Sequence, residues 1–275
     1  MNYIELNVRC TDEMAEILTA ELAEFPFDSF ATEPDTLKAY IPHERLADCH
    51  DRVEAMLAGY GISEHRYIAI ETQNWNALWE SNFPPVEVDG EVAIRAPFHA
   101  PYPDYRFDIV ITPKMSFGTG HHATTFLMSR ATAARDFAGK RVLDMGSGTG
   151  VLAIIAAKCG AESVDAVDID DWAYENCIEN CRENGVSEQI TAILGDVRKI
   201  HGKRYDTILA NINRNILLGD MPAYVESLND GGELIMSGIL EGDIETIRAR
   251  AEGLGLTFVS TDLKDGWAAV VTKKA

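Results

Sequence analysis

Asp144 and the glycines that follow it form the stretch of this sequence best suited to binding and chemistry. The run from 141 to 150 reads Arg-Val-Leu-Asp-Met-Gly-Ser-Gly-Thr-Gly, and an apolar run from 151 to 158 follows at once. A short strand, a glycine turn and the amino end of a helix together predict a site where a ligand approaches the backbone closely. The alternative, for these residues alone, is a turn that packs tightly and binds nothing.

Asp168 is the second candidate, at the end of an expected strand over 163–168. In doubly wound folds an acidic residue about 20 positions past the glycine turn binds ribose hydroxyls. The alternative role, capping the next helix, suits Asp170 or Asp171 better, because they directly precede the helical run that starts at Trp172. We therefore predict that Asp168 binds ribose. A dinucleotide fingerprint is excluded, because its third glycine would stand at Val151.

A glycine-punctuated loop over 115–125 precedes a helix expected at 126–135. We predict that it closes over a ligand and that Thr125 donates a hydroxyl hydrogen bond. The alternative is a helix start capped by Thr124 or Thr125, and both roles are compatible. His121 and His122 are adjacent, a spacing that suits a metal poorly, so no metal site is expected.

Alternation of strands and helices predicts an α/β fold with a doubly wound, mostly parallel sheet that binds ligands at the carboxyl ends of its strands. The strand 205–211 ends in Asn211, and the strand 189–194 is followed by Asp196, where an acid can reach an adenine amino group. The remaining expected elements are helices at 151–158, 172–181, 216–229 and 243–254, and strands at 88–96, 106–112, 142–143, 233–237, 257–262 and 267–272.

Residues 1–70 have the pattern of a separate small α+β domain, with strands at 4–8, 37–41 and 65–70 and two helices between them. A linker over 71–83 contains Trp75 and Trp79, and the second domain is expected at 84–275. The first domain contains 5 basic and 14 acidic residues, a formal charge of −9. We expect it to recognise a substrate, the alternative being an acidic surface that is merely solvated.

The whole chain has a formal charge of −20, which argues against direct binding of nucleic acid and allows a strongly basic partner. No apolar run approaches the roughly 20 residues that span a membrane. The first residues lack the pattern of a signal peptide, and the five cysteines are odd in number and scattered. We therefore expect a cytoplasmic protein with reduced thiols and no membrane contact, and the oligomeric state is left open.

Four segments together resemble one family: Phe117–Thr125, Asp144–Gly150, Asp168–Asp170 and Ala210–Ile212. Their order and spacing are similar to those of the ribosomal protein L11 methyltransferases (PrmA), which are class I S-adenosylmethionine-dependent enzymes. The resemblance extends over most of residues 75–275.

The resemblance implies methyl transfer from S-adenosylmethionine to lysine ε-amines and the α-amine of a basic large-subunit ribosomal protein. Matched by position, it implies donor binding by Thr125, Gly146, Asp168 and Asn211, with Asn211 also orienting the acceptor amine. Gly148 belongs to the same loop, and Asp196 is inferred from the class I fold. Asn213 and Arg214 stand where the family commonly has apolar residues, so the acceptor pocket is expected to differ there. The alternatives are a methyltransferase of another amine and a non-catalytic donor-binding module.

Overall fold

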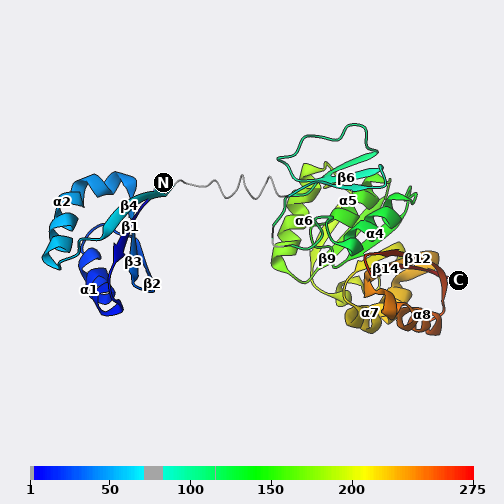
Figure 1. Ribbon diagram of the computed structural model, residues 1–275. Coiled ribbons are helices and arrows are strands. Elements are labelled where there is room, and N and C mark those ends of the chain that lie inside the picture. The colour runs from blue at the N-terminus through cyan, green and yellow to red at the C-terminus, as the bar shows by residue number, and fades with distance from the viewer. Residues whose placement is uncertain (1–2, 71–82, 115) are drawn as a thin grey trace. The chain divides into compact units, whose positions relative to one another are not determined.

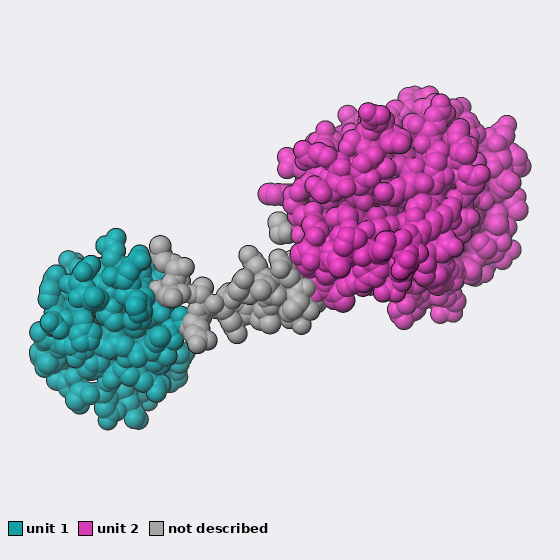
Figure 2. Space-filling model, turned by 90° about the horizontal axis from the view of Figure 1, so that it is seen from above, with its two compact units in different colours: residues 1–82 teal, residues 83–275 magenta. Residues whose placement is uncertain are grey.

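The computed structural model describes residues 3–70, 83–114 and 116–275. They belong to two compact units, residues 1–82 (unit 1) and residues 83–275 (unit 2), coloured separately in Figure 2. The expected linker lies outside the described residues except for Phe83, and so do Trp75 and Trp79. Within the described ranges, no helix has the length and apolar character needed to cross a membrane.

Unit 1 is a four-stranded antiparallel sheet with the strand order β2-β3-β1-β4 and both helices on one face (Figure 1). Its core is formed by alternate residues of the central strands, such as Leu6 and Leu37, packed against Leu18 and Val53 of the helices. Within the described residues of unit 1, no helix covers the other face of the sheet, which is called the open face below. The elements are β1 (Tyr3–Arg9), α1 (Asp12–Leu22), β2 (Ser29–Glu33), β3 (Thr36–Pro42), α2 (His43–Gly59) and β4 (His65–Ile70).

The strand β2 is absent from the sequence-based expectation, which had three strands in this unit. Phe30 is the one β2 residue that packs against the core, and the other four are exposed. A strand with a single inward apolar residue has almost no hydrophobic period of two, so the pattern does not reveal it. Pairing with β3 along its whole length supplies the missing stabilisation.

Unit 2 is built on a seven-stranded sheet with the order β10-β9-β8-β11-β12-β14-β13. The first five strands are parallel and the last two form an antiparallel hairpin, so the predicted fold class is confirmed. The strands are β8 (Arg141–Met145), β9 (Ser163–Asp168), β10 (Ile190–Leu194), β11 (Tyr205–Asn211), β12 (Leu228–Leu240), β13 (Leu256–Lys264) and β14 (Trp267–Lys274).

Helices cover both faces of this sheet (Figure 1). One face packs against α4 (Ala123–Ala133), α5 (Val151–Lys158) and α6 (Asp171–Glu183), and the other against α7 (Arg214–Ser227), α8 (Ile244–Gly253) and the short 3-10 helix η1 (Val197–Ile200). A second 3-10 turn, η2 (Glu241–Asp243), precedes α8. Seven of the eight α5 residues are buried, which explains why this run is apolar all round.

A small sheet covers the outer side of α4 and α5. It consists of β5 (Val86–Val88), β6 (Val92–Arg95) and β7 (Phe107–Val110), in that order. The sequence predicted strands at 88–96 and 106–112 as a pair, and β6 and β7 do pair, in parallel. The single strand expected at 88–96 is instead a hairpin of β5 and β6, turned at Asp89 and Gly90, both with positive φ.

Candidate functional site

A cavity of about 470 Å³ lies at the carboxyl ends of β8, β9, β10 and β11. This is the edge at which doubly wound folds bind ligands. Five residues that the sequence singled out line it together: Gly146, Gly148, Asp168, Asp196 and Asn211. Residues spread over 66 positions of the chain are thus brought into one site by the parallel strand order.

The glycine loop follows β8 and is shaped by close backbone contacts. Gly148 has a φ of 54°, and a Cβ there would lie 2.2 Å from the carbonyl oxygen of Phe117. That carbonyl accepts a hydrogen bond of 2.9 Å from the backbone N–H of Thr149. The loop and the segment at Phe117 therefore lie backbone against backbone, which no residue with a side chain at position 148 permits without movement.

Asp168 is held in place by backbone donors on both sides. Its Oδ2 accepts a hydrogen bond of 2.8 Å from Gly148 N, and its Oδ1 accepts one of 3.0 Å from Asp170 N. Each carboxylate oxygen has a second lone pair for a ligand. Asp170 caps α6 through the N–H of Trp172, as the sequence predicted, which leaves Asp168 available for ligand binding.

Asn211 ends β11 and faces the same cavity. Its Oδ1 is buried and has no hydrogen-bond partner among the described residues. Ser116 also lines the cavity, and its buried Oγ likewise lacks a partner in this part of the chain. Buried polar atoms without partners are rare in folded proteins because each costs desolvation energy, so these two atoms indicate a polar ligand.

Thr125 lies in a neighbouring cavity of about 400 Å³ that shares Ser116 and Phe117 with the first. Thr125 is only 1% exposed, and its buried Oγ1 has no hydrogen-bond partner in the described part of the chain. The expectation that Thr124 or Thr125 caps the helix is wrong. The cap of α4 is His122, whose Nδ1 accepts a hydrogen bond of 3.3 Å from Thr124 N, so the hydroxyl of Thr125 is not used for capping.

Asp196 caps η1, and its carboxylate is occupied by Arg198. Both oxygens accept from Arg198 Nε at 2.9 Å, Oδ2 accepts from Nη2 at 2.7 Å, and Oδ1 accepts from the backbone N–H of Arg198 at 3.0 Å. These bonds lower the pKa of Asp196 to about 2.

Two acidic residues of this region were not recognised as site residues. Asp220 lines the cavity from α7, in the middle of a helix, where no local motif marks it. Asp144 begins the glycine motif but is fully buried beneath the loop, where burial raises its pKa to about 7. Asp144 Oδ2 accepts a hydrogen bond of 3.1 Å from Ala153 N, near the start of α5, while Oδ1 has no partner within the ranges that the structure describes.

Asn213 and Arg214, which depart from the family pattern, have structural contacts. The side chain of Asn213 caps α7 by accepting from Ile216 N at 3.1 Å. Arg214 Nη1 donates to Asp243 Oδ1 at 2.7 Å. Neither residue lines the cavity, so these substitutions fix the start of α7 without adding a polar group to the cavity.

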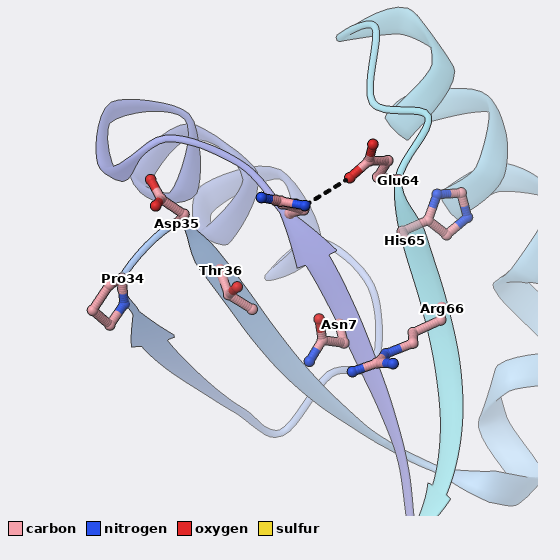
Figure 3. A pocket seen from close by; sticks show the side chains of 8 residues that line it. Asn7, Pro34, Asp35, Thr36, Glu64, His65 and Arg66 are labelled. Atoms are coloured by element: carbon pink, nitrogen blue, oxygen red, sulfur yellow. Dashed lines mark hydrogen bonds and ion pairs between the residues drawn. The ribbon is translucent and has the colours of Figure 1, made fainter.

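A third cavity, of about 550 Å³, lies at one end of the open sheet face of unit 1 (Figure 3). Its lining includes Asn7, Arg9, Glu64 and Arg66, and Arg9 Nη1 lies 3.5 Å from Glu64 Oε2 with both side chains mostly exposed. It contains no residue of the glycine motif or of the strand ends. We therefore place the chemistry in unit 2, although the cavity of unit 1 has the larger volume.

The sequence model of the family described as "Ribosomal protein L11 methyltransferase (PrmA)" matches residues 31–275. The chain belongs to this family. It is 43% identical over 261 residues to the ribosomal protein L11 methyltransferase of Porphyromonas gingivalis, an alignment covering 93% of this chain and 89% of that one. The corresponding protein of Bacteroides thetaiotaomicron is 40% identical over 279 residues, covering 98% and 99% of the two chains.

Among solved structures, the family is represented by the ribosomal protein L11 methylase of Lactobacillus delbrueckii subsp. bulgaricus. It matches with a TM-score of 0.63 and 27% identity, over 70% of this chain and 99% of that chain. The strand-end cavity fits the methyl donor that family membership implies, S-adenosylmethionine. The fit rests on the glycine loop, the carboxylate of Asp168 and the buried, unpartnered oxygen of Asn211.

Proposed function

We propose that this protein transfers methyl groups from S-adenosylmethionine to lysine ε-amines and the terminal α-amine of ribosomal protein L11. The observation that supports it best is the unpartnered, buried Oδ1 of Asn211 at the edge of the strand-end cavity. Thr125, Gly146, Gly148, Asp168 and Asn211 bind the donor in this proposal. We place the reaction in the cytoplasm, where the substrate protein is made.

Asn211 is proposed to align the acceptor amine. A lysine has an ordinary pKa near 10.4 and must lose a proton before its lone pair can attack. The donor supplies an electrophilic methyl group on a cationic sulfur, whose charge favours that loss. The Asn211 amide oxygen and the Ile212 carbonyl accept the remaining hydrogens of the amine and direct its lone pair. Alignment of this kind provides much of the acceleration of a displacement reaction, and no strong general base is required.

Unit 1 is proposed to capture the substrate protein through its helical layer. Helices α1 and α2 contain eight acidic and two basic residues, so the negative charge of this unit is concentrated on them. The lining of the cavity on the open sheet face is instead balanced in charge, with Arg9 and Arg66 beside Asp35 and Glu64. Figure 3 labels Asp35, Glu64 and Arg66. A lysine-rich protein is therefore attracted more strongly to the acidic helices than to this cavity.

The direct test is mass spectrometry of the purified ribosomal protein after incubation with the enzyme and S-adenosylmethionine. We expect mass increments of methyl groups on lysines and on the amino terminus, with S-adenosylhomocysteine as the second product. Donor binding without any methylation of this protein would favour a different amine acceptor. Failure to bind the donor would contradict the proposal as a whole.

Asn211→Ala tests the proposed alignment. The single-turnover rate should fall at least a hundredfold while the Kd for the donor rises less than tenfold, because the lost contact acts mainly in the transition state. The matched control is Asn215→Ala, which removes an amide that does not line the cavity. A variant that retains the wild-type single-turnover rate would assign the alignment to another residue.

A further inference from the structure

The strand order of unit 2 determines where each part of the donor lies, given the proposed function on which this inference depends. Along the sheet the order is β10-β9-β8-β11. Ribose binds at Asp168 after β9, and the methyl group lies near Asn211 after β11. Ribose connects the sulfur side of the donor to the adenine base, so the base extends in the opposite direction, toward the end of β10.

The cavity at the end of β10 has apolar side chains and two carboxyl groups. Ile169 and Ile216 line it and are 73% and 43% exposed, as expected of side chains that cover a flat base. Apolar contacts do not distinguish adenine from other purines, whereas a hydrogen bond to the 6-amino group does. Of the four aspartates that line the cavity, Asp168 and Asp170 bond to backbone N–H groups after β9. The remaining carboxyl groups are those of Asp196 and Asp220.

Asp196 has little capacity left for a ligand. Three N–H groups of Arg198 already bond to its two oxygens, with the Nε–H shared between both, and a carboxylate has about four lone-pair sites. A hydrogen bond from adenine would therefore compete with Arg198 for an oxygen that is already engaged. Asp196 is therefore poorly placed to recognise the adenine base by a hydrogen bond.

Asp220, in contrast, has hydrogen-bonding capacity left for a ligand. Its Oδ2 accepts one long hydrogen bond of 3.5 Å from the hydroxyl of Tyr224, a residue with no exposed surface. No donor in the described part of the chain bonds to its Oδ1. Asp220 and Asp196 line the same cavity, and burial together with the nearby charge of Asp196 raises the pKa of Asp220. Helix α7 also packs against η1, the element that Asp196 caps.

We propose that Asp220 accepts a hydrogen bond from the 6-amino group of the donor's adenine and thereby selects adenine over 6-oxopurines. The Tyr224 hydroxyl donates to the other oxygen of this carboxyl group from one turn further along α7. Asp196 instead fixes the turn after β10 through Arg198. Hypoxanthine, the base of inosine, has an oxygen where adenine has its 6-amino group. The lone pairs of that oxygen would face the Asp220 oxygen, so no hydrogen bond could form.

The test compares binding of S-adenosylhomocysteine and S-inosylhomocysteine to the full chain by calorimetry. The wild type should prefer the adenosyl compound at least tenfold, as one hydrogen bond to a charged group typically provides. Asp220→Asn should reduce this preference at least tenfold, because the amide NH₂ can donate to the 6-oxo group. Glu226→Gln, which neutralises an exposed carboxylate on the same helix, should leave the preference unchanged within twofold.

The possible results separate this inference from the proposed function. If the wild type binds neither compound, the proposed donor site is wrong. If it binds the adenosyl compound but Asp220→Asn keeps the full preference, the role of Asp220 is overturned while the donor site stands. A loss of preference in Asp196→Asn, with Asp220→Asn unaffected, would assign adenine recognition to Asp196.

Discussion

Asp168 combines two tasks in one carboxylate. It fixes the glycine loop through Gly148 N and Asp170 N, and it presents its remaining lone pairs to the cavity. Each hydrogen bond from a ribose hydroxyl to this charged group should contribute about 1.5–3 kcal/mol to donor binding. Loop geometry and ligand binding are therefore coupled at this residue.

Asp168→Ala should weaken donor binding at least tenfold in calorimetry, since it removes two such bonds. The melting temperature of the ligand-free protein should change little, because the two freed N–H groups lie beside an open cavity. Asp171→Asn is the control, since it alters a neighbouring carboxylate that does not line the cavity. Unchanged affinity in Asp168→Ala would remove this residue from the donor site.

Asp144 should make stability depend on pH. Burial raises its pKa to about 7, above the value of about 3.9 in an unfolded chain, so the folded protein holds the proton more tightly. The resulting stabilisation is complete below about pH 4 and is lost as the pH rises to about 7. A shift of three pKa units corresponds to a change of at most about 4 kcal/mol in the free energy of unfolding.

Asp144→Asn should remove this dependence, because an amide does not ionise. Urea denaturation of both proteins between pH 4.5 and 8 measures it, and the variant should gain stability relative to the wild type as the pH rises. Asp230→Asn, on an exposed carboxylate, should show no such trend. A difference in stability that is constant with pH would mean that Asp144 is ionised throughout the range.

At the scale of elements, the glycine loop of β8 and the segment before α4 form one structure. Their contact is the close approach of Gly148 to the Phe117 carbonyl and the hydrogen bond from Thr149 N. Thr149 Oγ1 also donates to Gly118 O at 2.8 Å. Segments about 30 residues apart thus stabilise each other's conformation. The two neighbouring cavities both include Ser116 and Phe117 in their linings.

Gly148→Ala should destabilise the protein and weaken donor binding together. A Cβ would lie 2.2 Å from the Phe117 oxygen, so one of the two segments must move. Gly139→Ala is the matched control, since Gly139 has a similarly positive φ of 69° but open space around its Cβ position. It should cost about 1–2 kcal/mol of stability, from the left-handed backbone alone, and leave donor affinity unchanged. Equal effects of the two variants would show that the contact with Phe117 is unimportant.

At the scale of the whole molecule, the donor cavity and the helices proposed to bind the substrate protein belong to different units. Unit 2 contains the donor cavity, and unit 1 carries its acidic residues mainly on α1 and α2. Exposed charges are screened over about 8–10 Å near physiological ionic strength. Binding of the basic ribosomal protein should therefore weaken with salt far more than donor binding does.

Neutralising Glu13 and Glu16, both exposed on α1, should raise the KM for the ribosomal protein several-fold at low salt with kcat and donor affinity unchanged. The control neutralises Glu183 and Glu188, two exposed glutamates of unit 2. Deleting residues 1–70 should abolish methylation of the ribosomal protein while donor binding persists. Normal catalytic efficiency of the shortened chain would assign substrate recognition to unit 2.

Much of unit 2 follows from the sequence alone. The alternating strand and helix patterns determine the doubly wound sheet, and the glycine loop, Asp168 and Asn211 stand at strand ends that local patterns reveal. Parallel strands bring such ends to one edge whatever the details of packing. The family was recognisable for the same reason, because its motifs are short segments in a fixed order.

Only the tertiary structure determines which partners these polar side chains bond to. Capping of α4 by His122, the engagement of Asp196 by Arg198 and the place of Asp220 beside the β10 end depend on contacts made only once elements pack. The strand β2 is likewise stabilised by its pairing with β3 and not by a pattern of its own. Local periodicity records which face of an element is buried, whereas the partner of a polar atom depends on how elements distant in the chain come together.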